Sequence, residues 1–391
     1  MIQKRTLLCL IVAPLLAAQS ATVKAQSFRP VAEVRALAQY QDQLTQGNQA
    51  SIRLQSLLIG RIAREFRKAP LKTWSVWRNS IAAVKYLISG GDPTFSERDE
   101  FVAAVPEGLR SLLLASRAYA QGDASTAKAL FAKIDQREID ASLGGHVALI
   151  KSLLAFPANP KASMQLLDDA RLLGAGTLVE EAAIRRQLGL VVRQQNHPRF
   201  QQLSMRYIRK FQKSVFASAF REHLADGLTN KKFKLDEKRS AWLNALFDRL
   251  DGQVRPDYCM LIAERALVQG RPDLVKIATT RLQQDLGRGS GRGRRARLFN
   301  AAMAIVEDDD KAAMELEQLK EFQPGSFESH LRQAAIAMAK GIAMPVDETG
   351  AKEQTVAGQS GKAVAAKDPD FAATRQAALS AIKDAGNLLA E

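Results

Sequence analysis

The sequence predicts an all-α protein, built as a tetratricopeptide-like solenoid of helical hairpins. Three observations support this fold class. Of the 391 residues 46% are hydrophobic but only 6% aromatic, and the alanines and leucines that dominate favour helices over sheets. Apolar residues recur at helical spacing, as at Leu243, Leu246, Phe247 and Leu250, and no long run alternates apolar and polar residues. Turn signals recur about every 37 residues along the chain.

The clearest hairpin lies around Gly122, in the stretch "RAYAQGDASTAKALF" at 117–131. Ala115 precedes the turn, and Ala127 and Phe131 follow it at helical spacing. Small residues allow two helices to approach closely, and the large one fills the space between them. This arrangement resembles the tetratricopeptide pattern.

The same template fits five further places, although none carries the full set of signature residues. Successive turns are separated by 32, 37, 37, 74 and 38 residues, and the interval of 74 equals two periods of 37. The predicted turns lie at residues 90, 122, 159, 196, 270 and 308. The alternative interpretation is an α-helical domain without repeats.

The first residues predict export from the cytoplasm. Lys4 and Arg5 precede a short apolar run, and the small residues Val23 and Ala25 suit cleavage after Ala25. We therefore expect residues 1–25 to be a signal peptide and the mature chain to be a soluble periplasmic protein. The alternative is an uncleaved anchor, but the run is too short for a bilayer of roughly 30 Å. Loss of this segment would reduce the formal charge from +15 to +12. The remaining chain would still be strongly basic, and a basic protein attracts acidic partners.

The composition of the rest of the chain predicts three parts: a repeat domain, a linker and a short C-terminal helix. Residues 26–340 are expected to form the α-helical repeat domain. Within it, the Gly/Arg-rich segment 287–297 predicts an exposed, mobile loop. Residues 341–370 contain few large apolar side chains and predict a disordered linker. Residues 371–391 predict a short C-terminal helix.

The sequence contains no motif that indicates an enzyme, a cofactor or a metal site. No two histidines lie four residues apart, and neither a zinc-type cysteine pair nor a hydrolase elbow is present. We expect a non-enzymatic protein without cofactors. His146 in "LGGHVAL" is interpreted as a turn or cap residue. Cys259 lies in an apolar helical segment and is expected to be buried in the core.

Two charged segments have a structural interpretation. In "MRYIRKFQKSVF", residues 205–216, the basic residues are displaced from the apolar face, which favours a basic amphipathic repeat helix over nucleic-acid binding. Thr177 and Glu180 have the spacing of a capping box, and Arg185 follows Glu181 by one helical turn. The adjacent Glu180 and Glu181 point to different helix faces, so electrostatics at a helix start explains them better than acid–base catalysis.

Several segments, taken together and in order, resemble the MotC family of periplasmic motility proteins. The resemblance spans roughly residues 35–340 and is weaker in its C-terminal third. The segments that carry it are "LLIGRIAREF" (57–66), "VKYLISGGDP" (84–93), "SLGGHVALIKSLL" (142–154), "ARLLGAGTLVEEAAIRR" (170–186) and "YIRKFQKSVFASAFREHLA" (207–225).

The resemblance implies a non-enzymatic protein that stays soluble in the periplasm and has no stable membrane span after signal cleavage. It also implies association with the periplasmic region of the flagellar stator protein MotB, in support of flagellar rotation. Basic residues on the best-matched helices are the candidate partner-binding residues: Arg185, Arg186, Arg206, Arg209 and Lys210.

Two other functions remain open on the sequence. A helical solenoid presents an extended surface for proteins, so the chain fits a scaffold for cell-wall synthesis or another envelope assembly. A cell-wall-cleaving enzyme is the third hypothesis, since some lytic transglycosylases carry a helical superhelix. The segment after residue 340 is too short and polar for the catalytic domain that such an enzyme needs.

Overall fold

The computed structural model describes residues 29–287, 289–306, 310–319 and 321–343. These residues form α-helices, two short 3₁₀ helices and no strand, so the predicted all-α fold is confirmed. The helices are α1 Pro30–Thr45, α2 Ala50–Lys68, η1 Leu71–Ser75, α3 Trp77–Ile88, η2 Pro93–Ser96, α4 Asp99–Ala104, α5 Glu107–Ala120, α6 Ala124–Phe131, α7 Ala141–Ala155, α8 Pro160–Leu173, α9 Leu178–Arg193, α10 His197–Phe211, α11 Ala217–Thr229, α12 Glu237–Arg249, α13 Arg255–Val268, α14 Pro272–Leu286, α15 Gly291–Val306, α16 Asp310–Gln318 and α17 Phe327–Ala343.

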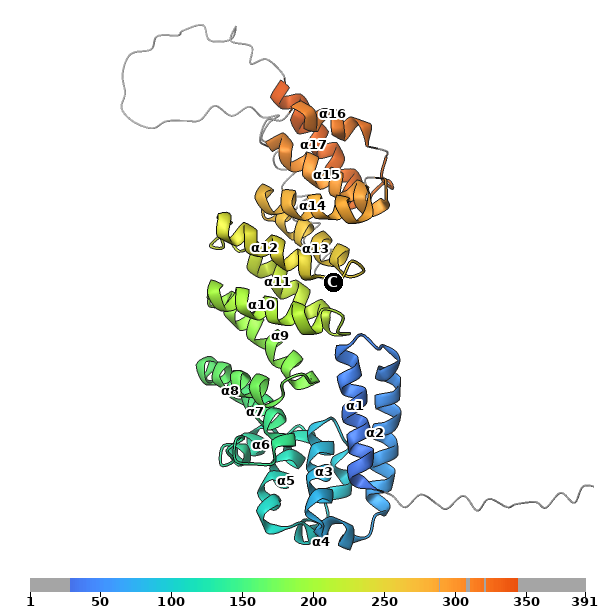
Figure 1. Ribbon diagram of the computed structural model, residues 1–391, viewed down its shortest axis with the longest axis vertical. Helices are drawn as coiled ribbons and strands as arrows, with labels where there is room; N and C mark the ends of the chain where they lie inside the picture. Colours follow the sequence, from blue (N-terminus) through green and yellow to red (C-terminus); the bar gives the residue numbers. More distant parts are fainter. Residues whose placement is uncertain (1–28, 288, 307–309, 320, 344–391) are drawn as a thin grey trace, which may run out of the picture.

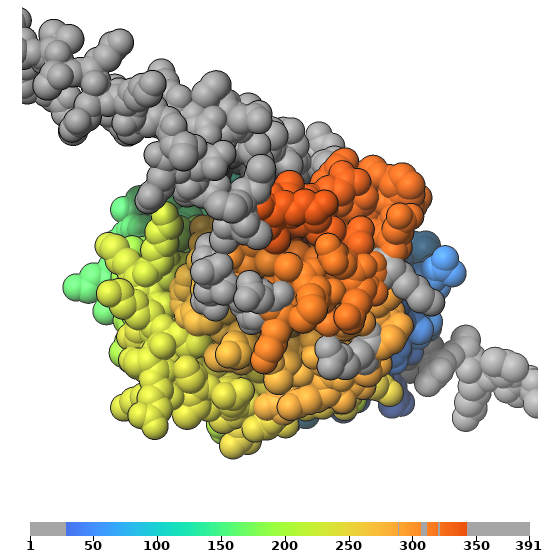
Figure 2. Space-filling model, turned by 90° about the horizontal axis from the view of Figure 1, so that it is seen from above, coloured from blue at the N-terminus to red at the C-terminus, as the bar shows by residue number. Residues whose placement is uncertain are grey.

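From α5 onward the helices stack as successive antiparallel hairpins along one axis (Figure 1). Figure 2 looks onto one end of this stack, formed by the C-terminal helices in orange, with the blue N-terminal hairpin on one flank. The largest core cluster runs from Ile184 to Ala335 and a second from Val34 to Ile150, and a small cluster around Leu167 lies between them. In the described part of the chain, no helix is both long and apolar enough to cross a membrane.

Five of the six predicted turns are where the sequence places them. Gly90, Gly122 and Gly270 each follow a helix with a positive φ of 87°, 80° and 63°, a conformation that glycine adopts without steric penalty. Asn159 and Asn196 cap α8 and α10 by accepting backbone N–H groups with their side chains. These turns confirm the repeat period in this part of the chain.

The double interval of 74 residues contains a further hairpin. The loop 230–236 joins α11 to α12, close to the midpoint that a period of 37 residues requires. The predicted turn at 308 lies outside the described residues. So do the predicted signal peptide 1–25, the helix 371–391 and the linker 341–370, except that residues 341–343 complete α17.

The prediction of a loop at 287–297 is wrong for residues 291–297, which open α15. Three of their four arginines pair with acids on neighbouring helices, including Arg295 with Glu264 at 2.8 Å and Arg297 with Glu315 at 2.5 Å. Ala296 between them is fully buried. These contacts with other helices stabilise residues 291–297 as a helix, although their glycines favour a loop.

The hairpin at the first predicted turn, Gly90, departs from the tetratricopeptide-like pattern in its second half. A 3₁₀ helix and the six-residue α4 occupy the place of a full second helix. Phe95 and Phe101 on these short elements pack against Phe66, Trp74 and Tyr86 in a cluster of aromatic rings. The rings fill the space that a longer helix would otherwise occupy.

Two glycines set how closely α7 and α8 pack. A Cβ on Gly145 would lie 2.8 Å from the backbone nitrogen of Gly174 and 3.0 Å from its Cα. Both glycines belong to segments that carry the family resemblance. The absence of a side chain at Gly145 therefore lets the backbone of α7 approach the backbone at the end of α8.

Replacing Gly145 with alanine is expected to reduce the free energy of unfolding by about 1–3 kcal/mol, because the backbone must move to admit a methyl group. Gly60 is the matched control, since a Cβ there meets only the tip of Arg64 at 3.9 Å. Alanine at Gly60 should stabilise α2 by about 0.5–1 kcal/mol. Urea denaturation of both variants measures the difference. Equal effects at the two glycines would contradict the close approach of α7 and α8.

The N-terminal hairpin of α1 and α2 does not simply continue the stack. It lies alongside it and reaches from α3 to the loop before α11 (Figure 1). The backbone N–H of Val215 donates to the carbonyl oxygen of Leu44 at 3.0 Å, and that of Leu178 donates to Asp42 Oδ1 at 3.1 Å. The hairpin thus joins segments more than 130 residues apart in the sequence.

Candidate functional site

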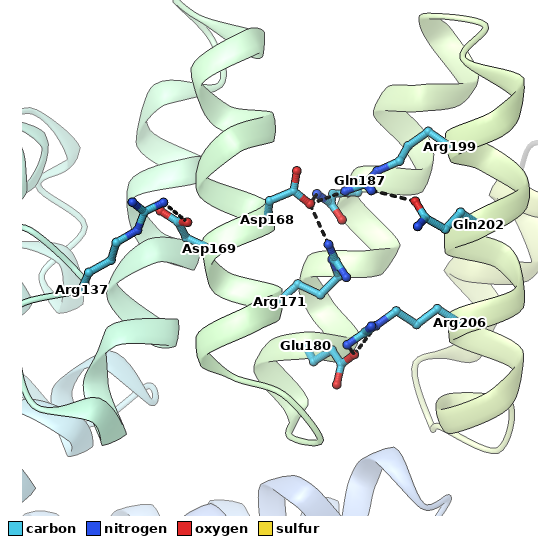
Figure 3. Close-up of polar contacts among 9 residues, drawn as sticks. All are labelled: Arg137, Asp168, Asp169, Arg171, Glu180, Gln187, Arg199, Gln202 and Arg206. Carbon is cyan, nitrogen blue, oxygen red and sulfur yellow. Dashed lines mark hydrogen bonds and ion pairs between the residues drawn. The ribbon is translucent and has the colours of Figure 1, made fainter.

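The predicted partner-binding residues lie on α9 and α10, next to two carboxylates at the start of α9. Glu180 has no exposed side-chain surface. Its carboxylate accepts hydrogen bonds from the Gly176 N–H at 2.6 Å, Arg206 Nε at 2.6 Å and Lys210 Nζ at 2.9 Å; Figure 3 shows the pair with Arg206. Burial alone would raise the pKa of Glu180, but these three donors outweigh it and hold the pKa below its ordinary value.

Glu181 is equally buried but turns toward different partners. Its carboxylate accepts from Arg185 Nε at 2.8 Å, from the Tyr207 hydroxyl at 2.8 Å and from Ser214 Oγ at 3.3 Å. The Tyr207 ring stacks on Phe220 with centroids 3.7 Å apart. Burial, together with the neighbouring carboxylate, raises the pKa of Tyr207, so the hydroxyl stays protonated and donates to Glu181.

At the start of α9, capping by Thr177 and the pair between Glu181 and Arg185 are as predicted, but the reciprocal bonds of a capping box do not form. Thr177 accepts from the Val179 N–H at 3.2 Å, and Glu180 reaches back to Gly176 instead of to Thr177 itself. The two acids do point in different directions, each with its own partners. Favourable electrostatics at a helix start does not fully explain these two acids. Both are completely buried, and they also bond to α10 and to the segment that follows it.

These contacts divide the five candidate residues into two groups. Arg185, Arg206 and Lys210 form ion pairs with the two buried acids, so their first role is to join α9 to α10. Arg186 and Arg209 are exposed and have no ion pair with an acid within the described residues. These two arginines therefore remain available to another molecule.

Asp168 forms a second polar centre, between α8, α9 and α10 (Figure 3). Its Oδ1 accepts from Arg171 Nη2 at 3.0 Å, from Gln187 Nε2 at 2.9 Å and from Arg199. The neighbouring Asp169 pairs with Arg137 at 2.6 Å. No group of three or more potential metal-binding side chains occurs among the described residues, and the arginines here give Asp168 the role of joining repeats.

An exposed stripe on α2 was not predicted as a site. It consists of five residues at alternating intervals of three and four, and we call it the α2 stripe: Leu54, Leu57, Arg61, Arg64 and Lys68. This spacing places all five on one face of a helix. Leu57 is 70% exposed and Leu54 41%, so two large apolar side chains face solvent beside three cations. The spacing is visible in the sequence, but it does not by itself tell a buried face from an exposed one.

Two predictions about single residues had different outcomes. Cys259 is fully buried in the core, as predicted, and burial raises the pKa of its thiol to about 12. His146 is not a turn or cap residue, because it lies inside α7. Burial lowers the pKa of its imidazole to about 4, so the ring is neutral at neutral pH.

Comparison with known proteins gives the family. The family described as "Chemotaxis protein MotC" matches residues 1–391. The chain is 26% identical over 329 residues to a protein named "Chemotaxis protein MotC" from Rhizobium meliloti (strain 1021), covering 82% of this chain and 74% of that protein. No solved structure matches the chain. A match along the entire sequence shows that this chain belongs to the MotC family and is a protein related to motility and chemotaxis.

Proposed function

We propose that this chain is a non-enzymatic periplasmic protein that binds the periplasmic region of the stator protein MotB and so supports flagellar rotation. The family match along the whole chain is the observation that carries the proposal. The long helical stack is compatible with it, because repeat proteins bind partners over extended surfaces.

The α2 stripe is the surface that we propose for this contact. Exposed leucines beside arginine and lysine suit a protein partner that covers the leucines and brings carboxylates to the cations. Arg61 already pairs with Glu33 on α1, and Lys68 lies 3.9 Å from Glu65. Both pairs are on the surface, where water competes with the interaction, so an acidic partner can replace them at little cost.

Replacing Leu57 with aspartate is expected to weaken binding to a purified MotB periplasmic fragment by at least about tenfold, which corresponds to 1.4 kcal/mol. The change removes an exposed apolar anchor and places a negative charge among cations. Because Leu57 is 70% exposed, the thermal unfolding temperature should remain close to that of the unaltered protein. Biolayer interferometry with the immobilised fragment measures the affinity.

The matched control is Leu172→Asp on α8, where the leucine is 63% exposed but lies outside the α2 stripe. This variant should bind as the unaltered protein does. Equal loss in both variants would indicate a general effect of added charge. Unchanged binding by the Leu57 variant would exclude the α2 stripe from the contact.

The role in motility is tested in a strain that lacks the gene. Swimming in soft agar should be lost and should return with the unaltered gene, but not with the Leu57→Asp gene at equal protein levels. Cell fractionation should place the mature protein with periplasmic markers. Normal swimming by the deletion strain would contradict the proposal.

A further inference from the structure

A cavity of about 270 Å³ lies where the N-terminal hairpin meets the helical stack. Its walls come from four helices and the start of a fifth: α1, α3, α7, α9 and Phe216 just before α11. At about 30 Å³ per water molecule, the volume corresponds to roughly nine waters. A compact molecule of about ten heavy atoms would fit it.

The polar groups that line the cavity are rich in hydrogen-bond donors. The Lys85 side chain has no hydrogen bond or ion pair with any other described residue, so the three N–H groups of its ammonium lack an acceptor in that part of the chain. Arg185 uses Nε for Glu181, at 2.8 and 2.9 Å. Its two Nη groups have no protein acceptor in the described part of the chain.

The single carboxylate in the cavity wall is already engaged. Asp42 Oδ1 accepts from the Leu178 N–H at the start of α9, at 3.1 Å. Asp42 and Lys85 attract each other through space, but burial is the stronger influence on both: it raises the pKa of Asp42 and lowers the pKa of Lys85. Folding therefore disfavours the charged form of Lys85 when the cavity holds no anion.

The rest of the wall is mixed: Gln41, Ser89, His146 and Thr177 contribute neutral polar groups, and the other side chains are apolar. Leu149, Val179 and Ile88 contribute hydrophobic side chains, and the Phe216 ring lies 5.3 Å from the guanidinium carbon of Arg185. Cationic donors next to an aromatic and aliphatic wall match a molecule with a carboxylate at one end and a small apolar group at the other.

We propose that this cavity is a binding site for a small monocarboxylate. The carboxylate oxygens accept hydrogen bonds from the Lys85 ammonium and from the Nη groups of Arg185, and the apolar end packs against Phe216 and Leu149. Because one wall belongs to α1 and the others to the stack, the bound molecule also strengthens the attachment of the N-terminal hairpin.

Thermal unfolding of the full mature chain with benzoate tests this site. Benzoate has a carboxylate, a small apolar ring and nine heavy atoms, and neutral benzamide has nearly the same shape. At constant ionic strength, saturable benzoate binding should raise the unfolding temperature, and benzamide should have an effect at least tenfold weaker at equal concentration. No increase with benzoate, or equal increases with the two compounds, would overturn the proposal.

The Lys85→Met variant gives an independent test. Without ligand it should unfold at a higher temperature than the unaltered protein, because the partly buried ammonium, whose charged form burial disfavours, is gone. Its half-saturating benzoate concentration should increase at least tenfold. Lys128→Met is the control, since Lys128 is exposed on α6 outside the cavity, and it should respond to benzoate as the unaltered protein does. An unchanged benzoate response in the Lys85 variant would also overturn the proposal.

Discussion

Replacing Glu181 with alanine is expected to lower the free energy of unfolding by about 3–5 kcal/mol, the range for breaking a buried charged network by removal of one partner. The carboxylate is completely buried and accepts from Arg185, Tyr207 and Ser214. Alanine would leave the tyrosine and serine hydroxyls without their acceptor in the interior, and Arg185 without its acid. Guanidinium denaturation followed by circular dichroism measures the loss.

Glu222→Ala is the control for this prediction. Glu222 also pairs with an arginine, Arg265 at 2.8 Å, but its side chain is 46% exposed. Because water replaces the lost partner there, the expected loss is about 1 kcal/mol or less. A similar loss in the two variants would show that burial of Glu181 does not determine the effect.

Replacing Phe66 with alanine is expected to destabilise the N-terminal region by about 3–5 kcal/mol. Its ring is 1% exposed and lies 4.8 Å from Trp74, 4.9 Å from Tyr86 and 4.9 Å from Phe95, measured between centroids. The cavity would open where three other rings converge, and they could not close it without moving short helices. Tryptophan fluorescence during denaturation reports the change, since Trp74 lies in the cluster.

Phe156→Ala provides the comparison for this aromatic cluster. The Phe156 ring is 39% exposed, and its neighbour across the surface is the guanidinium of Arg193 at 5.7 Å. Such a contact contributes about 0.5–1 kcal/mol. If Phe66→Ala were as mild as this change, the aromatic cluster would not be an important part of the N-terminal core.

The sequence was sufficient to predict the fold class and most of the turns, because turn chemistry is local. Gly122 and Gly270 need a positive φ, and Asn159 and Asn196 cap the helix that follows each of them. The loop 230–236 is not among the predicted turns, although the interval of 74 residues leaves room for one more period of 37. It contains no glycine, and Asn230 supplies the turn by accepting from the Lys232 N–H at 2.9 Å.

The loop prediction at 287–297 failed because it relied on local composition. Glycine and arginine together are typical of exposed loops, but the acids that hold Arg295 and Arg297 lie 18 to 33 residues away in sequence. A pattern confined to eleven residues contains no information about those partners. Packing between repeats therefore overrides the local preference.

The partners of the basic residues could not be predicted for a related reason. Arg206 and Lys210 pair with Glu180, which lies 26 and 30 residues earlier. Helical spacing defines the face on which each side chain lies, but not how one helix is shifted along its neighbour. The contact between Asp42 and Leu178 spans 136 residues, and it depends on a hairpin that leaves the regular stack.

The most direct test of the proposed function is the affinity of residues 26–391, the mature chain that the predicted signal cleavage would leave, for the purified periplasmic fragment of MotB. We predict a saturable complex that weakens as salt is raised, because cations of the α2 stripe contribute to it. Both proteins should be shown to be folded by circular dichroism before mixing. No complex at either low or high salt would contradict direct binding to MotB, and with it the central claim about this protein.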